Sequence, residues 1–500
     1  MTDAPEVDYS DIQGLVRFGY GKLTEATFVL LSIRDVRAAR AWLGTAPISS
    51  AVKLKQAPLT ALQVAFTREG LQAMQVPEPV LAGFSAEFLT GMAGDESRSR
   101  RLGDVGANAP SNWKWGGSGK VPHLMVMAYA RENELDSWLQ TIRGADWDAA
   151  FEVLDSLSTS NLYGVEPFGF TDGVSQPALA WEQAPQTSGD QLEYRNRTAL
   201  GEFLLGYVNE YGKYTDRPLL PASDASAAML PVAEDTPEMR DLGRNGAYVV
   251  FRQLQQDVRG FWQFLNQQSG GDASSRMSLA ESMVGRTQKG DPLVPMSGQP
   301  IDGVREQEAP QNQFTYDLDQ SGVRCPFGAH VRRANPRNAD LPPGSSGEVS
   351  KLLHTLGFGE SGYRDDVMAS TRFHRLLRRG REYGPGLSVE QAIDANWPHN
   401  AEHGIHFITI NANISRQFEF VQNSWVMSTK FNGLTEESDP LLGNREPVSG
   451  CPFTNVFSLP QQDGLRKRII GLPQFVTVRG GAYFFLPGIS ALRYLSCLGG

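Results

Sequence analysis

Cysteine is scarce in this 500-residue sequence, and so are long apolar runs. Its 3 cysteines, Cys325, Cys451 and Cys497, lie far apart and form no C-x-x-C pair, which excludes a disulfide framework and predicts a reduced, cytoplasmic protein. No apolar run approaches the roughly 18–20 residues that cross a membrane. The N-terminal segment is acidic before Arg17, whereas a secretory signal begins with basic residues. We therefore expect no membrane partner.

A block of basic residues is also missing. Lys and Arg total 46 against 56 Asp and Glu, a net charge of −10, and such a chain lacks the positive patch that attracts phosphate backbones. We therefore expect no nucleic-acid partner. The remaining composition, with 40% apolar residues, 51 Gly and 30 Pro, is that of a globular protein and excludes collagen-like and disordered chains.

Short apolar runs followed by amphipathic segments recur along the chain. Residues 28–33 form a buried-strand run, and Asp35 then precedes a segment, residues 36–43, whose apolar positions follow helical spacing. The same succession of strand and helix returns at residues 62–74, 123–139, 248–265 and 404–421. This alternation predicts an α+β fold.

Two α+β halves are the simplest account of the repetition. The mixed stretch at residues 218–241 is expected to join them. Gly-, Pro- and Ser-rich segments at 268–312 and 335–350 are expected to be surface loops rather than linkers between further domains.

Three segments hold candidate functional residues. Asp172 lies in Gly-Phe-Thr-Asp-Gly at 169–173, which fits a turn that lines a pocket as well as an ordinary surface turn. His330 is a lone histidine among apolar residues with arginines close behind it. Such an imidazole can bind a metal or haem iron through one nitrogen, or it can be a satisfied core histidine. The arginine-rich segment 375–381 also fits an ion-paired face, so the residues alone leave these alternatives open.

A fourth segment matches the H-x-x-E-H pattern of zinc hydrolases with His399, Glu402 and His403. That chemistry needs both histidines and the glutamate on one helical face. Pro398 precedes the cluster, and the residues after Gly404 have strand character, so helical presentation is not expected. A zinc hydrolase is kept as the less favoured alternative.

Taken together, the three segments resemble the dye-decolorising peroxidases, a family of haem enzymes. Residues 169–173 fit the family's G-x-x-D-G motif. Residues 325–337 resemble the stretch that carries its proximal histidine, and residues 376–384 resemble the stretch that carries its distal arginine. The likeness extends from residues 11–15 to 479–485 and is similar to a longer bacterial branch of the family.

The resemblance implies an α+β fold with two ferredoxin-like domains, each an antiparallel sheet with helices. Residues 1–235 would form the first domain, including the segment with Asp172, and residues 236–500 the second. The haem would lie between the sheet and the helices of the second domain. An insertion at 338–371 separates the two candidate haem segments of that domain.

The resemblance also implies a role for each candidate residue. His330 would be the axial ligand of the haem iron. Asp172 would take a proton from the peroxide oxygen nearest the iron and return it to the departing oxygen. Arg378 would stabilise the negative charge that develops as the O–O bond breaks. Arg375 and Arg379 are the alternatives to Arg378, because the insertion makes the alignment of this segment ambiguous.

Further residues are assigned around the ligand. Arg333 and Arg337 follow His330 closely and are expected to pair with the haem propionates. The family's acidic residue that orients the proximal histidine aligns with Asn413, whose amide is a weaker acceptor than a carboxylate. Cys325 is expected to be a small buried hydrophobe rather than an iron ligand. No C-x-x-C-H motif is present, so non-covalent haem b is implied.

The implied activity is the reduction of hydrogen peroxide coupled to one-electron oxidation of dyes, phenols or other aromatic reductants. An aspartate base has a reference pKa of about 3.9, against about 6.5 for a histidine base. We therefore expect an acidic pH optimum. The alternative in another functional class is a non-catalytic haem carrier or sensor, which would use His330 and leave Asp172 and Arg378 idle.

Overall fold

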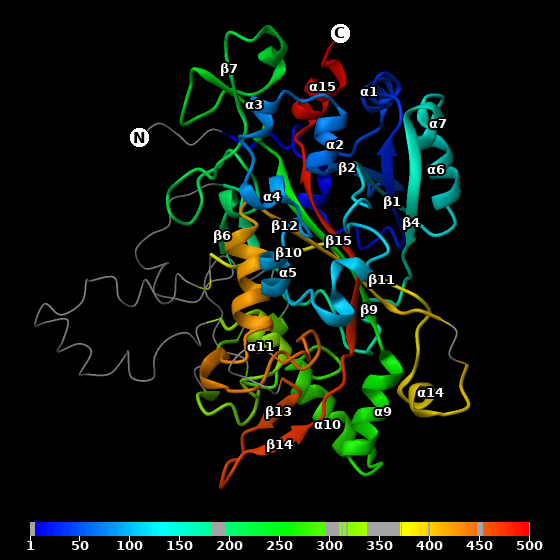
Figure 1. The fold of residues 1–500 in the computed structure, drawn as a ribbon, viewed down its shortest axis with the longest axis vertical. Helices are drawn as coiled ribbons and strands as arrows, with labels where there is room; N and C mark the ends of the chain where they lie inside the picture. The colour runs from blue at the N-terminus through cyan, green and yellow to red at the C-terminus, as the bar shows by residue number, and fades with distance from the viewer. Residues whose placement is uncertain are drawn as a thin grey trace, which may run out of the picture.

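The computed structural model describes residues 6–182, 197–295, 310–312, 314–316, 319–337, 371, 373–398, 401–447 and 454–499. These residues form an α+β structure around a nine-stranded sheet in which neighbouring strands are antiparallel (Figure 1). The α+β fold predicted from the sequence is confirmed.

The first half of the sheet contains β1 (Glu25–Ile33), β2 (Thr60–Phe66), β3 (Leu124–Ala130) and β4 (Phe151–Ser158). Helix α1 (Val36–Thr45) follows β1, and helices α6 (Leu135–Arg143) and α7 (Trp147–Ala150) connect β3 to β4. The strands lie in the order β2-β3-β1-β4. This β-α-β-β-α-β succession is that of a ferredoxin-like unit.

The second half repeats the arrangement. It contains β9 (Ala247–Gln256), helix α9 (Val258–Gln268), β10 (Leu377–Arg378), β11 (Arg381–Tyr383), β12 (Gly404–Asn411), the π-helical segments η9 (Ser415–Glu419) and η10 (Val421–Val426), and β15 (Val476–Leu486). The strand order is β10-β12-β9-β15, with β11 also paired to β12. Strand β15 meets β2 where Phe485 pairs with Phe66, which joins the halves into one sheet. The domain boundary between residues 235 and 236 falls in the connection between β4 and β9 and stays a prediction.

The remaining elements surround this sheet. The helices are α2 (Arg68–Ala73), α3 (Glu78–Leu81), α4 (Ala86–Thr90), α5 (Glu96–Leu102), α10 (Ala273–Val284), α11 (His330–Ala334), α14 (Val389–Ile393) and α15 (Ile489–Cys497). The two-stranded pairs are β5 (Ala178–Ala180) with β6 (Arg197–Ala199), β7 (Leu219–Pro221) with β8 (Met239–Asp241), and β13 (Val456–Leu459) with β14 (Lys467–Ile470). The short 3-10 turns are η1 (Gly14–Val16), η2 (Gly106–Asn108), η3 (Pro110–Asn112), η4 (Leu200–Glu202), η5 (Ala225–Met229), η7 (Pro310–Asn312) and η11 (Phe431–Gly433).

Both faces of the sheet are buried. On β1, Val29 and Leu31 belong to an apolar cluster that includes Trp42 of α1, whereas Phe28 and Leu30 belong to a second cluster. Successive side chains of a strand point to opposite faces, so the two clusters lie on the two sides of the sheet. Burial on both sides explains why these strands read as continuous apolar runs in the sequence.

Local sequence signals set the helix boundaries. The Asp35 side chain accepts a hydrogen bond from the N–H of Ala38 at 2.8 Å and caps α1. Asp257 caps α9 in the same way through Gly260 at 2.8 Å. The prediction that residues 268–312 are entirely loop was wrong, because α10 occupies Ala273–Val284. The predicted loop at 335–350 lies mostly outside the described residues.

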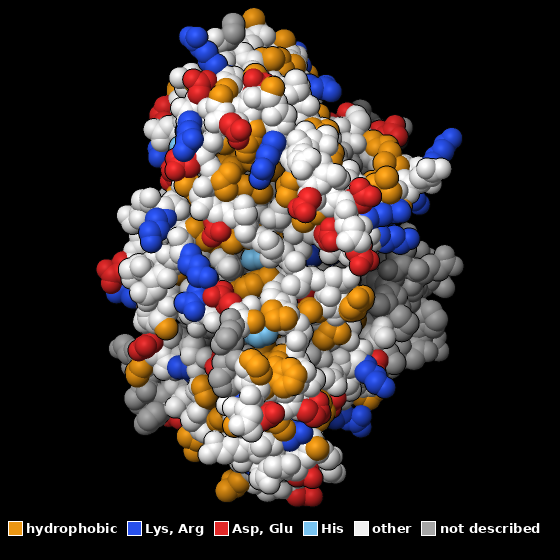
Figure 2. All heavy atoms as spheres, turned by 90° about the vertical axis from the view of Figure 1, so that its right-hand side faces the viewer, with side chains coloured by type: hydrophobic (Ala, Val, Ile, Leu, Met, Phe, Trp, Pro, Cys, Tyr) orange, Lys and Arg blue, Asp and Glu red, His pale blue; other side chains and the backbone are white. Residues whose placement is uncertain are grey.

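Side chains of both signs of charge are scattered among apolar ones on the face shown in Figure 2. That mixture agrees with the absence of a basic block in the sequence. Within the described part of the chain, no helix combines the length and apolar character needed to cross a bilayer.

Candidate active site

Asp172 lies on the loop between β4 and β5, and glycines flank its turn. Gly169 and Gly173 have φ angles of +100° and +76°, which favour glycine because other residues meet steric strain there. Phe168 and Phe170 are buried in an apolar cluster beneath α9. The loop is therefore anchored by its aromatic residues and turned by its glycines, and Asp172 projects from a fixed backbone.

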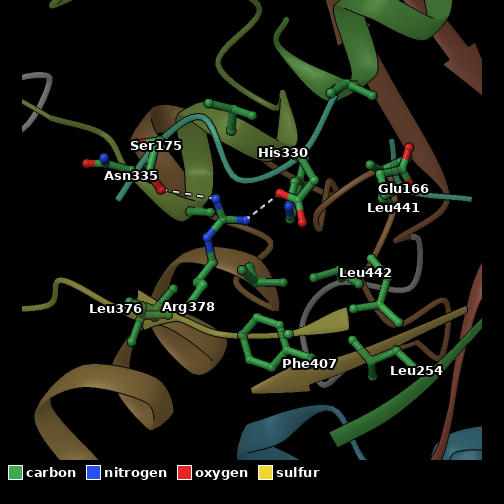
Figure 3. A pocket seen from close by; sticks show the side chains of 18 of the residues that line it. Glu166, Ser175, Leu254, His330, Asn335, Leu376, Arg378, Phe407, Leu441 and Leu442 are labelled. Atoms are coloured by element: carbon green, nitrogen blue, oxygen red, sulfur yellow. Dashed lines mark hydrogen bonds and ion pairs between the residues drawn. The ribbon is translucent and has the colours of Figure 1, made fainter. Parts of the chain in front are cut away.

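Arg378 ends β10 and contacts the Asp172 loop at three points. Its Nη2 donates to the carbonyl of Ser175 (Figure 3), its Nη1 to Oδ1 of Asp172, and its backbone N–H to Oε1 of Gln176, each at 3.0 Å. Burial acts to raise the pKa of Asp172, but the charge and hydrogen bond of Arg378 outweigh it and hold the pKa below the usual range. Asp172 is thus a carboxylate even in mildly acidic solution.

His330 is the first residue of α11, and its ring is held by a buried carboxylate. Its Nδ1 lies 2.9 Å from Oδ2 of Asp439, whose side chain is fully buried. Oδ1 of Asp439 accepts hydrogen bonds from the N–H groups of Leu441 and Leu442, both at 2.9 Å. Because a carboxylate only accepts, the proton lies on Nδ1 and Nε2 of the neutral ring keeps its lone pair. That is the form of histidine that binds a metal.

His330 and Asp439 also shift each other's pKa. Burial alone would lower the pKa of His330, but the charge of Asp439 and its hydrogen bond outweigh burial and raise it. Burial alone would raise the pKa of Asp439, and His330 reverses that shift as well. Asp439 therefore stays ionised as the acceptor of the His330 proton.

Asp172, His330 and Arg378 line one cavity of about 270 Å³. In Figure 3, His330 and Arg378 lie at its wall, with apolar side chains gathered below them. Those apolar residues include Leu254 of β9, Phe407 of β12, Leu376 and Leu442, and Leu441 lines the cavity beside Glu166. A largely apolar cavity with a few converging polar groups is typical of a ligand or cofactor site.

Arg286 is a further cation in the cavity wall. Its Nη1 donates to the carbonyls of Gly290 at 2.7 Å and Gln311 at 2.9 Å, while its Nη2 is buried without a hydrogen-bond partner among the described residues. Burial, together with the like charges of Arg337 and Arg378, lowers the pKa of Arg286 to about 10. A buried guanidinium with an unused N–H is a strong partner for an anionic group.

No family model matches the chain, but individual relatives match nearly all of it. The chain is 28% identical to the dye-decolorizing peroxidase msp1 of Mycetinis scorodonius, over 97% of this chain and 87% of the relative. It is 26% identical to the multifunctional dye peroxidase DyP2 of an Amycolatopsis species, over 95% and 91%. The solved structure of a fungal DyP-type peroxidase from Auricularia auricula-judae has a TM-score of 0.72 and 27% identity, covering 99% of this chain and 100% of that chain.

Over nearly its whole length the chain is similar to dye-decolorising peroxidases, and it is a peroxidase of that type. Members of this family are haem enzymes, and the cavity of this peroxidase fits the cofactor. His330 offers a lone pair, the unused Nη2 of Arg286 matches an anionic propionate, and the apolar walls match the porphyrin plane.

Arg333 and Arg337, which were expected to bind the propionates, do not line the cavity of the peroxidase. Arg333 donates to the backbone carbonyls of Gly328, Trp425, Ser428 and Glu437 at 2.7–3.2 Å. Arg337 donates to the carbonyls of Asn312 and Phe314 and to the side chain of Asn312 at 2.6–2.9 Å. Both guanidinium groups tie loops together, whereas Arg286 and Arg375 are the arginines that line the cavity besides Arg378.

Asn413 does not hold the axial histidine candidate. Its Oδ1 accepts from the backbone N–H of Arg416 at 2.8 Å and from Oγ of Ser415 at 3.1 Å, so it caps the start of η9. The acceptor at His330 is Asp439. The ring is therefore held by a carboxylate, although the family alignment placed the amide of Asn413 at this role. The expectation of a weak amide acceptor was wrong.

The three arginines considered as the distal arginine have different surroundings in the structure. Arg378 contacts Asp172. Arg379 donates to the carbonyls of Leu15 at 2.7 Å and Val16 at 2.9 Å and lies away from the cavity lining. Arg375 lines the cavity.

The zinc-like segment has other partners. His399 lies outside the described residues, and Glu402 accepts hydrogen bonds from Tyr383 at 3.0 Å and Lys114 at 3.1 Å. Nδ1 of His403 lies 2.7 Å from the carbonyl oxygen of Pro385. Strand β12 begins directly after His403. The helical presentation that zinc hydrolysis needs is therefore absent from the described residues here. Cys325 is buried, which raises its pKa to about 12 and agrees with its expected role as a small hydrophobe.

Sequence reasoning missed three residues of the site: Glu166 and Arg286, which line the cavity, and Asp439, which holds the His330 ring. Glu166 carried a signal, because it stands just before the Gly-Phe-Thr-Asp-Gly segment. Arg286 lies in a segment rich in glycine and serine that was taken as loop. Asp439 is 109 positions from His330, so no local spacing pattern could connect them.

Proposed function

We propose that this peroxidase binds haem b without covalent attachment, reduces hydrogen peroxide, and oxidises dyes, phenols or related aromatic reductants in one-electron steps. The observation that carries the proposal is that His330, backed by Asp439, and the Asp172–Arg378 pair line the same cavity. The relatives named as dye peroxidases support the choice of reductant.

His330 would hold the iron through Nε2, since Asp439 occupies the Nδ1 side of the ring. Arg286 would pair with a propionate. When bound, haem supplies an iron centre that exchanges electrons with peroxide and with the reductant. This arrangement would place the cofactor against β9, β12 and the π-helical segments, all of which contribute cavity residues.

Asp172 would act as the base of the peroxide reaction. It accepts a proton from one peroxide oxygen and can return it to the departing oxygen. Its pKa, held down by Arg378 against burial, keeps the base form present in acid. The activity is therefore expected to persist at acidic pH, and its loss at the acidic end should come as the pH drops through a value below the usual carboxyl range.

Arg378 would stabilise negative charge on the departing oxygen. Its guanidinium is fixed by Ser175 and Asp172, so it is already oriented and costs no reorganisation when charge develops. A non-catalytic haem carrier would need His330 alone, and the paired Asp172 and Arg378 favour the peroxidase.

The test is a haem titration followed by addition of peroxide. We expect a Soret band with the wild-type protein, its weakening in His330→Ala, and rapid dye oxidation on adding peroxide. A normal Soret band with no turnover would support the carrier instead, and an unchanged spectrum in His330→Ala would refute the ligand assignment.

Two further statements from the sequence stay proposals. We propose a cytoplasmic location on the cysteine usage, which cell fractionation tests. We also keep the longer bacterial branch as a proposal, although the similar curated relatives come mostly from fungi.

A further inference from the structure

Glu166 is an acidic residue of the cavity that the proposed chemistry does not use. It stands at the start of the loop that carries Asp172, and its half-buried side chain lines the same cavity. In Figure 3 it lies beside Leu441, with His330 between it and Arg378 in this view. Two carboxyl groups from one loop therefore face one chamber.

The carboxyl of Glu166 receives three neutral hydrogen bonds within the described chain. Oε2 accepts from the N–H of Phe168 at 2.9 Å and from Nε2 of Gln256 at 2.8 Å, and Oε1 accepts from the N–H of Phe170 at 2.9 Å. These contacts brace the loop, which is the structural role of the residue. None of them brings a positive charge to the carboxyl.

The environments of the two carboxyl groups shift their pKa values in opposite directions. Asp172 has the Arg378 cation at 3.0 Å. Glu166 has only neutral donors, and burial raises its pKa to about 7, with the charge of Asp172 acting in the same direction. The other titratable or charged groups of the cavity wall, apart from Arg378, are Arg286, His330, His374 and Arg375, and no ion pair joins them to Glu166 in the described structure. When the environments of two carboxyl groups push their pKa values apart in this way, the group with the lower pKa can serve as base and the group with the higher pKa as acid.

We propose that Glu166 is the general acid of the peroxide reaction and Asp172 its base, acting through water in the cavity. This inference rests on the proposed peroxidase function. Asp172 takes the proton of one peroxide oxygen, the O–O bond breaks, and the departing oxygen, which keeps its own hydrogen, takes a proton from Glu166 and leaves as water.

The protons and electrons of this step balance. The reaction leaves Asp172 protonated and Glu166 ionised, and transfer of the proton from Asp172 to Glu166 through water restores both groups. The two electrons that cleave the O–O bond come by way of the cofactor and are replaced, one at a time, by two molecules of the aromatic reductant. The second peroxide oxygen leaves as a second water once it has taken two protons from the solvent. The proposal adds a source for the second proton, so Asp172 need not deliver the proton that it has just accepted.

The first test is the infrared spectrum of the resting holoprotein as a function of pH. We expect a protonated-carboxyl C=O component that disappears as pH rises through about 7, that shifts in D2O, and that Glu166→Gln loses, whereas the similar component of Glu202, whose pKa burial also raises to about 7, stays. The matched control is Glu382→Gln, because burial also raises the pKa of Glu382 and Asp172 acts on it, yet Glu382 lies outside the cavity lining. The band should survive in the control. A Glu166→Gln spectrum that has lost no such component relative to the wild-type spectrum overturns the proposal.

The second test is the pH profile of the reaction with peroxide. A general acid works only while protonated, so the wild-type rate should decline as pH rises through about 7. Glu166→Gln should be slower by about 100-fold at low pH and should lack that decline. A role limited to bracing the loop would lower the rate and leave the shape of the profile unchanged, and that outcome refutes the inference.

Gln256→Leu decides the matter if Glu166→Gln does not fold. Its side chain donates to the ionised carboxyl, so its removal should move both the infrared midpoint and the decline in rate to higher pH. Unchanged positions of both would overturn the proposal. Failure of the peroxidase function itself is distinguishable, because it would appear as a missing Soret band or absent turnover in the wild-type protein.

Discussion

Replacing Asp439 with asparagine changes a single acceptor atom beside His330. The Asp439 carboxyl faces one donor on the His330 ring and two backbone donors, the N–H groups of Leu441 and Leu442, all at 2.9 Å. An amide has one acceptor atom and one donor group. If its oxygen stays with the backbone donors, its NH2 faces Nδ1 and drives the ring proton to Nε2, where it blocks iron. If the amide turns over, its NH2 meets two N–H groups.

Either arrangement forfeits a buried hydrogen bond at the ligand. Loss of such an outer partner weakens metal binding by about 10- to 100-fold, which is about 1.4–2.8 kcal/mol. We expect Asp439→Asn to raise the Kd for haem by that factor, measured by fluorescence quenching as haem is added to the apoprotein. We also expect a weaker iron–imidazole bond, seen as a lower stretching frequency in the resonance Raman spectrum of the reduced protein.

The control for this prediction is Asn413→Asp. Asn413 was the orienting residue expected from the family alignment, but in the structure it caps η9, where an aspartate is equally suitable. We expect its haem Kd to stay within about twofold of the wild-type value, a difference below 0.5 kcal/mol. A wild-type Kd and stretching frequency in Asp439→Asn, or a marked gain of affinity in Asn413→Asp, would refute the assignment of Asp439.

Three further variants probe the other arginines and the base. Arg378→Leu should slow the reaction with peroxide by about 100-fold. Because Arg378 holds the pKa of Asp172 down, the loss of activity at low pH should also move to higher pH in stopped-flow profiles. If the acidic side of the pH profile does not move, Asp172 is not the base. Arg286→Met should weaken haem binding by about tenfold through the lost charged hydrogen bond, and an unchanged Kd would place the propionate elsewhere. Arg333→Met should lower the free energy of unfolding in urea by about 3 kcal/mol, since several buried carbonyls lose their donor at about 1 kcal/mol each; a loss below about 0.5 kcal/mol would show that water replaces it.

The strands and their following helices could be predicted because their signals are local. Asp35 and Asp257 both cap helices, and each follows an apolar run that the structure shows as a buried strand. Helix α10 was missed although Asp272 caps it and Gly285 ends it. The glycine and serine around it led to a loop assignment, whereas the cap and the spacing of Leu279 and Met283 were the better guide.

The site could be predicted only where a motif or a resemblance marked its residues. Asp172, His330 and Arg378 come from three such segments, and the structure brings them to one cavity. The propionate assignment relied on closeness in sequence, and it failed because Arg333 points its donors at carbonyls more than 90 positions away. Asp439 could not be predicted for the same reason, because no local sequence pattern indicates which distant carboxylate the fold places beside the His330 ring.

The duplicated strand order has a consequence for how the side chains of the cavity are divided along the chain. Asp172 follows the strands of the first repeat, whereas His330 and Arg378 lie within the second. The second repeat by itself would lack the Asp172 carboxylate, and the first would lack both His330 and Arg378. The set of side chains at the cavity is therefore complete only in a chain that carries both repeats.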